Sequence, residues 1–141
     1  MRYLETESDY IVRLERGEEI LEALEKFCLE KDIAAASVSG IGACDLAEVG
    51  VYEIDKKAYM KNTYTGSMEI LSLLGNITRK DGRPYLHLHI TLCGEDNRCI
   101  GGHLNKARIS VTGEIFIHPV NGLIGRVPDD VTGINLMDLP R

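Results

Sequence analysis

The chain of 141 residues lacks an apolar run long enough to cross a membrane. A spanning helix needs about 20 consecutive residues of mainly apolar character. The first residues, Met1 to Glu5, turn acidic at once and lack the apolar central region of a secretory signal. Both absences argue against membrane-spanning and secreted classes, and we expect a cytoplasmic protein.

Basic runs are also missing, and the formal net charge is −6. Lysine and arginine contacts to phosphates supply most non-specific affinity for nucleic acid. The composition therefore disfavours DNA as a general partner. The segment Gly82-Arg83-Pro84 has no basic flank of the kind found in AT-hooks, and we interpret Lys80 to Pro84 as a turn between strands.

Paired cysteine motifs are absent as well. The four cysteines, Cys28, Cys44, Cys93 and Cys99, form no Cys-x-x-Cys pair and no dense framework. We interpret them as reduced thiols, mostly small core residues. Cys93 and Cys99 flank a polar segment and can approach each other across a hairpin, so a disulfide between them stays open.

Histidine, in contrast, is concentrated in one stretch. Three of the four histidines lie between residues 87 and 103, and two of them alternate with apolar residues. Alternation places successive side chains on opposite faces of a strand. One face then consists of core residues, Leu86, Leu88, Ile90 and Leu92. The opposite face carries Tyr85, His87, His89 and Thr91.

A shared metal ion is the simplest reason for imidazoles on the second face of a core strand. His87 and His89 lie roughly 6.6 Å apart at the backbone, and two imidazoles can converge from there on one ion at about 2.0–2.1 Å. The polar segment 94–98 predicts a turn that brings Gly101-Gly102-His103 beside them. The paired glycines permit close backbone approach or positive φ.

The predicted ligand set is therefore His87, His89 and His103, with zinc as the leading divalent ion. Cys93 lies roughly 13 Å along the strand from His89, too far to share that ion. His118, between Ile117 and Pro119, is interpreted as a strand-end residue. The alternative is that all of these histidines are ordinary polar residues on a half-exposed strand.

Along the chain, hydrophobic periodicity predicts one convincing helix and many strands. The helix opens at Gly17-Glu18-Glu19 and closes at Lys31-Asp32. A buried strand at 33–39 is expected to end in a glycine turn at 40–43, and the tail from 119 to 141 is expected to be irregular, with short turns. Further strands are predicted at 10–14, 46–54, 58–64, 68–78, 84–93, 98–104 and 109–118. We therefore expect a single domain over 1–141 of the α+β class, a mostly antiparallel sheet with one main packed helix.

Several motifs together resemble the plants-and-prokaryotes conserved domain, abbreviated PPC. The resemblance implies an α+β fold on a large antiparallel sheet and a homotrimer. In plants the domain follows AT-hooks in nuclear proteins and mediates interactions among subunits and with other factors. Free-standing microbial members carry a DNA-binding label by analogy, and this chain has no AT-hook. The motifs are Ser39-Gly40-Ile41-Gly42, Glu69 to Ile77, Asp81-Gly82-Arg83-Pro84, His87-Leu88-His89 and Gly101-Gly102-His103-Leu104.

The fold also looks like that of acetolactate decarboxylase, a zinc enzyme whose metal is held by a His-x-His pair and a third histidine further on. His87, His89 and His103 match that layout in order. Glu69 and Glu114 are weak candidates to hydrogen-bond a ligand or move a proton.

Three functions follow from these observations. The first is a trimeric zinc-binding domain of unassigned activity, whose open ion offers a place for a small-molecule ligand. The second is a DNA-binding or protein-interaction module in transcriptional regulation. The third is a zinc-dependent lyase or hydrolase that acts on a small carbonyl compound.

Overall fold

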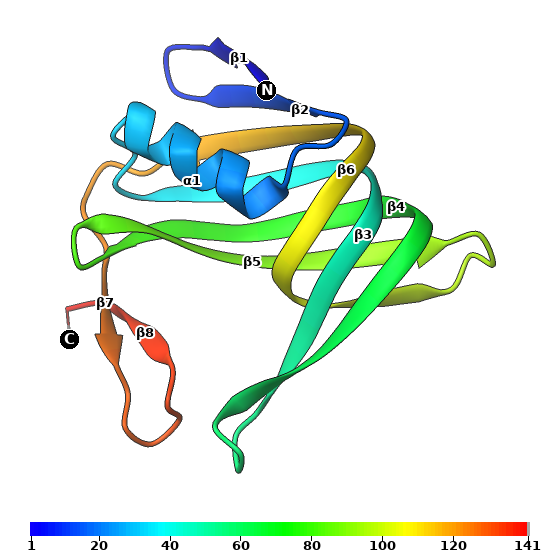
Figure 1. Ribbon diagram of the computed structural model, residues 1–141. Coiled ribbons are helices and arrows are strands. Elements are labelled where there is room, and N and C mark those ends of the chain that lie inside the picture. Colours follow the sequence, from blue (N-terminus) through cyan, green and yellow to red (C-terminus); the bar gives the residue numbers. More distant parts are fainter. Residues whose placement is uncertain (141) are drawn as a thin grey trace.

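The computed structural model describes residues 1–140. Its main sheet has the strand order β1-β2-β6-β3-β4-β5, all antiparallel, and β6 also pairs with β5, so the four long strands close on themselves (Figure 1). Strands β7 and β8 form a separate antiparallel pair. This arrangement confirms the predicted α+β class. The elements are β1 (Arg2–Glu5), β2 (Tyr10–Glu15), α1 (Ile20–Glu30), β3 (Ala36–Glu53), β4 (Ala58–Lys80), β5 (Arg83–Gly94), β6 (Cys99–Pro119), β7 (Gly125–Pro128) and β8 (Asn135–Asp138).

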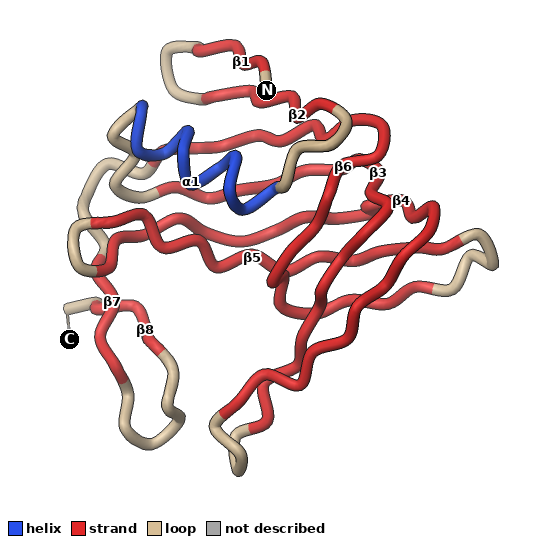
Figure 2. The backbone as a smooth tube through the Cα atoms, viewed as in Figure 1, coloured by secondary structure: helices blue, strands red, loops and turns tan. Residues whose placement is uncertain are grey.

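Helix α1 packs one apolar face against the main sheet (Figure 2). The Glu19 side chain caps its N-terminus by accepting the backbone N–H of Glu22 at 2.8 Å. Asp32, with φ of 50°, turns the chain away after the helix. The predicted helix is thus confirmed, and its face buries Ile20, Leu24, Phe27 and Cys28.

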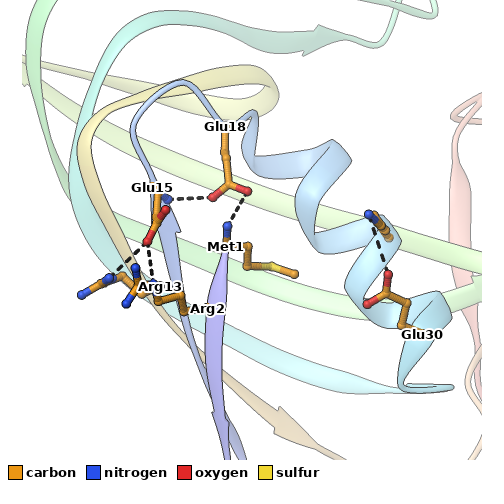
Figure 3. Close-up of polar contacts among 7 residues, drawn as sticks. Met1, Arg2, Arg13, Glu15, Glu18 and Glu30 are labelled. Atoms are coloured by element: carbon orange, nitrogen blue, oxygen red, sulfur yellow. Dashed lines mark hydrogen bonds and ion pairs between the residues drawn. The ribbon is translucent and has the colours of Figure 1, made fainter.

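A group of polar contacts joins the first strands to the start of the helix (Figure 3). The Glu18 carboxylate accepts from the amino group of Met1 and from the backbone N–H of Glu15, each at 2.7 Å. Glu15 in turn pairs with Arg2 at 2.9 Å and with Arg13 at 3.2 Å. The arginines are exposed, so these pairs orient β1 and β2 more than they stabilise the fold.

The long strands correct several predicted boundaries. The predicted glycine turn at 40–43 is wrong, because β3 runs through it with register shifts on either side of Gly42. A Cβ at Gly40 would stand 2.8 Å from the Glu114 carbonyl oxygen, so the glycine serves close strand approach instead of a turn. In the same way, 58–64 and 68–78 belong to β4, and 98–104 and 109–118 belong to β6. Bulges keep each long strand continuous while it bends.

The tail is more ordered than its composition predicts. Residues 125–138 form the β7–β8 hairpin, which corrects the expectation of irregular chain. The sequence patterns also give no sign of β1. The backbone N–H of Arg79 on β4 donates to the Ile124 carbonyl at 2.9 Å and holds the start of this hairpin. The turn predicted at Lys80 to Pro84 is confirmed, with positive φ at Asp81 and Gly82. Within residues 1–140, no helix combines the length and apolar character needed to cross a membrane.

Candidate metal centre

Strand β5 has the two faces that its alternation predicts. Leu88, Ile90 and Leu92 are at most 1% exposed in the core, and Leu86 packs against the same cluster. His87 is half-buried on the opposite face, as are Tyr85 and Thr91, and His89 is exposed there. The core side therefore fixes the register, and that register aims the imidazoles outward.

The third histidine comes from the neighbouring strand, as predicted. The polar turn after β5 reverses the chain, and β6 places His103 directly opposite His89. The ring centroids are 5.2 Å apart for His87 and His89, 5.2 Å for His87 and His103, and 5.6 Å for His89 and His103. One ring nitrogen from each histidine lies within 4.8 Å of the others. Two nitrogens bound to one tetrahedral ion stand about 3.4 Å apart, so modest ring rotations complete the set.

The paired glycines before His103 allow β6 to fit between two strands. A Cβ at Gly102 would meet the carbonyl oxygen of Gly50 on β3 at 2.5 Å. A Cβ at Gly101 would meet that of Ile90 on β5 at 2.7 Å. Any side chain here would push a neighbouring strand away. The predicted reason for the paired glycines, close backbone approach, is confirmed.

Tyr59 on β4 completes the surroundings of His103. The two rings stack with centroids 4.4 Å apart at 28°, and Tyr52 meets Tyr59 edge-on at 5.0 Å. The Nδ1 atom of His103 is buried and has no hydrogen-bond partner within residues 1–140. A buried polar atom without a partner is costly, and a metal ion is a partner that imidazole nitrogen takes readily. The donor set therefore fits a metal.

Burial favours the neutral, metal-binding form of two of the three imidazoles, those of His87 and His103. It lowers the pKa of His103 to about 4, with smaller contributions from His87, His89 and Lys61. Burial also lowers the pKa of His87, with His89 and Arg126 adding to the effect. Protons therefore compete weakly with a metal ion for these two rings at neutral pH.

The two candidate glutamates lie outside the group of three histidines. Glu69 and Glu114 are exposed and line one groove of about 400 Å³ together with Ile41, Leu71 and Val111. Neither belongs to the histidine group. Their predicted role at a bound ligand stays a prediction.

Two other predicted features lie outside the histidine group. Cys93 faces Cys99 directly across the β5–β6 hairpin, and both thiols are free. His118 lies next to the end of β6, as predicted, and its Nδ1 is 2.8 Å from the Asp9 carboxylate.

Sequence reasoning missed Tyr59 and Arg126 because each reaches the histidines from a distant segment. The alternation within β5 carries no signal for either residue.

Residues 1–121 match the family model of the Plants and Prokaryotes Conserved (PCC) domain. The chain belongs to this family. It is the PPC family that the motifs resemble. No curated protein matches this PPC domain at a significant level.

Two solved structures resemble the PPC domain over nearly its whole length. A "putative DNA binding protein" of Bacteroides thetaiotaomicron is 35% identical with a TM-score of 0.94, covering 97% of this chain and 96% of that one. A metal-containing protein of Archaeoglobus fulgidus is 38% identical with a TM-score of 0.86, covering 96% and 98%. Their names therefore span two of the functions that the sequence left open.

A third structure confirms the predicted likeness to the decarboxylase fold. A Staphylococcus aureus protein of unknown function, similar to alpha-acetolactate decarboxylase, is 13% identical with a TM-score of 0.56. The match covers 85% of this chain and 56% of that one. At this identity the likeness concerns the fold alone.

Proposed function

We propose that this PPC domain binds a divalent metal ion, with zinc as the leading candidate, through His87, His89 and His103. The observation that carries the proposal is the convergence of three ring nitrogens within 4.8 Å on one face. The partnerless Nδ1 of His103 supports it, since coordination gives a buried ring nitrogen a partner. The metal-containing protein of Archaeoglobus fulgidus, 38% identical, also supports it.

Three neutral ligands are the number found in catalytic zinc sites, where the fourth position takes water or substrate. When bound, such an ion acidifies water or polarises a carbonyl group. This chemistry suits the lyase or hydrolase function on a small carbonyl compound. We include this function in the proposal because three protein ligands would leave the fourth position of the ion free for substrate.

We also propose that the domain works as a homotrimer. The outer apolar patch, defined as Ile41, Leu71, Leu74, Val111 and Phe116, consists of side chains that are each at least 42% exposed. Strand pairing gathers them, because Ser39 on β3 pairs with both Leu74 and Phe116. An apolar patch of this kind usually marks an interface, and the resemblance to the PPC family predicts three copies.

Metal analysis of protein prepared without an affinity tag tests the metal site. We expect close to one divalent ion per chain, and its loss in the double variant His87→Ala, His89→Ala. His118→Ala is the matched control, because His118 contacts Asp9 and is not in the ligand group. Unchanged metal content in the double variant contradicts the assignment.

Size-exclusion chromatography with light scattering tests the assembly, with and without a chelator. We expect a trimer in both conditions if the outer apolar patch holds it together, and dissociation in Val111→Glu. Dissociation by chelator alone would instead make the ion part of the assembly. A monomer under all conditions contradicts the proposal.

DNA binding is the second candidate, favoured by the name of the Bacteroides structure and opposed by the net charge of −6. A gel-shift titration across salt concentrations separates specific DNA binding from non-specific DNA binding. Binding that persists near physiological salt supports a specific DNA function. Binding only at low salt is non-specific attraction to phosphates.

A further inference from the structure

Arg126 lies in β7, beyond the residues that match the PPC family model. It is half-buried, and its guanidinium donates three hydrogen bonds. Nε donates to Thr78 Oγ1 at 2.9 Å, Nη2 to Asn76 Oδ1 at 2.7 Å, and Nη1 to the Asn135 carbonyl at 3.1 Å. These bonds fix the planar group against β4.

The same bonds place the guanidinium beside the histidines. Asn76 is directly opposite His87 in the β4–β5 register, and Thr78 is opposite Tyr85. Opposite residues share one face of a sheet, about 5 Å apart. The guanidinium also lies over the Tyr85 ring, 4.8 Å from its centroid. The positive charge of Arg126 therefore stands on the histidine face, next to His87.

This charge has no counter-ion within residues 1–140. The three acceptors of Arg126 are neutral, and no carboxylate stands within ion-pair distance of it there. Arg79, the other arginine within residues 1–140 that is not exposed, pairs with Asp32 at 2.9 Å. Lys61, which also acts on the histidine group, pairs with Glu48 at 3.0 Å. A partly buried charge without a partner is costly, so the guanidinium is suited to receive an anion.

Contacts at the far end of the tail hold Arg126 in this position. The Tyr52 hydroxyl donates to the Thr132 carbonyl at 2.5 Å, and Lys57 Nζ donates to the Asp130 carbonyl at 2.6 Å. The β7–β8 hairpin is thus attached to β4 at one end and to the β3–β4 hairpin at the other, on the same side of the molecule (Figure 1). Such attachment reduces the entropy lost when a ligand binds.

We infer that Arg126 is a ligand-binding residue of the metal centre, and that the centre takes a small oxyanion, a carboxylate or a phosphate. This inference rests on the proposed metal site. A dipositive ion on three neutral imidazoles, with a guanidinium beside it and no carboxylate in the ligand group, leaves the site strongly positive. The guanidinium has five N–H donors, of which the protein uses three. Its planar group matches the oxygens of carboxylate and phosphate.

Isothermal titration of zinc-loaded protein tests the inference, with acetate and inorganic phosphate as probes and acetamide as the neutral counterpart of acetate. The anion that binds more tightly shows whether the site prefers a carboxylate or a phosphate. Arg126→Gln should weaken that anion about tenfold or more, because a charge-assisted hydrogen bond is lost. Arg126→Lys should fall between this variant and the wild type. The control Arg108→Gln removes an equal charge, one that pairs with Asp45 on another part of the sheet, and should change nothing.

Metal content is measured in every sample, which separates the two proposals. A wild type without metal overturns the metal site itself. Anion binding that is equally tight in wild type and Arg126→Gln, at full metal content, overturns the role of Arg126 alone. If Arg126→Gln fails to fold, NMR spectra of the wild-type protein still test the inference. There the Nε–H resonance of Arg126 should shift as the anion saturates, that of Arg108 should not, and an unmoved Arg126 resonance also overturns the inference.

Discussion

Gly75→Ala tests whether the spacing of β4 and β5 sets the metal site. Gly75 lies opposite Leu88, between the partners of His87 and His89. A Cβ at Gly75 would fall inside van der Waals contact with the His87 carbonyl oxygen and 2.8 Å from the Leu88 Cα, whereas ordinary contacts begin at 3.4 Å. The added methyl must therefore move β5 by at least about 0.6 Å, the shortfall of the Leu88 contact, because the His87 contact is closer still.

Both stability and metal affinity should fall. Overpacking a well-packed core typically costs about 1–3 kcal/mol. The upper part of that range applies because the clashing atoms are backbone and cannot rotate away. Binding sites require their groups within about 0.5 Å of the productive geometry. A shift of β5 exceeds that tolerance at two of the three ligands, so metal affinity should fall about tenfold or more.

Urea unfolding of the metal-free proteins measures the change in the free energy of unfolding without any contribution from metal. Competition with a chromophoric chelator gives the metal affinity. Gly94→Ala is the control on the same strand pair, since its Cβ would meet nothing nearer than 3.6 Å. It should leave both quantities near the wild type. If Gly75→Ala is as stable as the wild type and binds metal equally well, strand spacing does not control the site.

Three further substitutions address other parts of the molecule. Phe27→Ala, which empties a fully buried position on α1, should lower the free energy of unfolding by about 3–5 kcal/mol in urea while metal content stays unchanged. Tyr59→Ala removes the ring stacked on His103 and should weaken metal binding about tenfold in the chelator assay, whereas Tyr59→Phe should not. The hydrogen bond from Lys31 lowers the pKa of Glu5, so the carboxylate stabilises the fold above its ordinary pKa. Glu5→Gln should therefore be less stable than the wild type at neutral pH, and the difference should vanish in urea titrations as the pH falls through the lowered pKa.

Local patterns were sufficient for the features that depend on neighbours in the chain. The alternation around His87 and His89 predicts both faces of β5, because the period of a strand is fixed by its backbone. The polar turn and paired glycines before His103 likewise predict that this residue lies beside His89. The spacing of Leu24 and Phe27 predicts the buried face of the helix. In each case the residues that carry the signal lie within about 20 positions of one another in the sequence.

Features that depend on distant pairing could not be predicted in this way. Gly40 and Gly42 carry the signal of a turn, yet in a closed sheet the absence of a side chain serves the approach of β6. The same residue type therefore supports two opposite interpretations, and only the neighbouring strand decides between them. Tyr59 and Arg126 reach the histidines from residues far away in the sequence, and the strands of the tail are four residues each, too short for a periodic signal.

A metal ion on the three histidines would link metal binding to closure of the sheet. Pairing between β5 and β6 runs from Cys93 and Cys99 at the turn to His89 and His103 at its far end, five residue pairs in all. Beyond that point β6 continues along β3, so the last pair holds the place where the two strands separate. An ion shared by His87, His89 and His103 would join the strands there. Because the three histidines meet only when the sheet is closed, the free energy of metal binding would add to the free energy of folding.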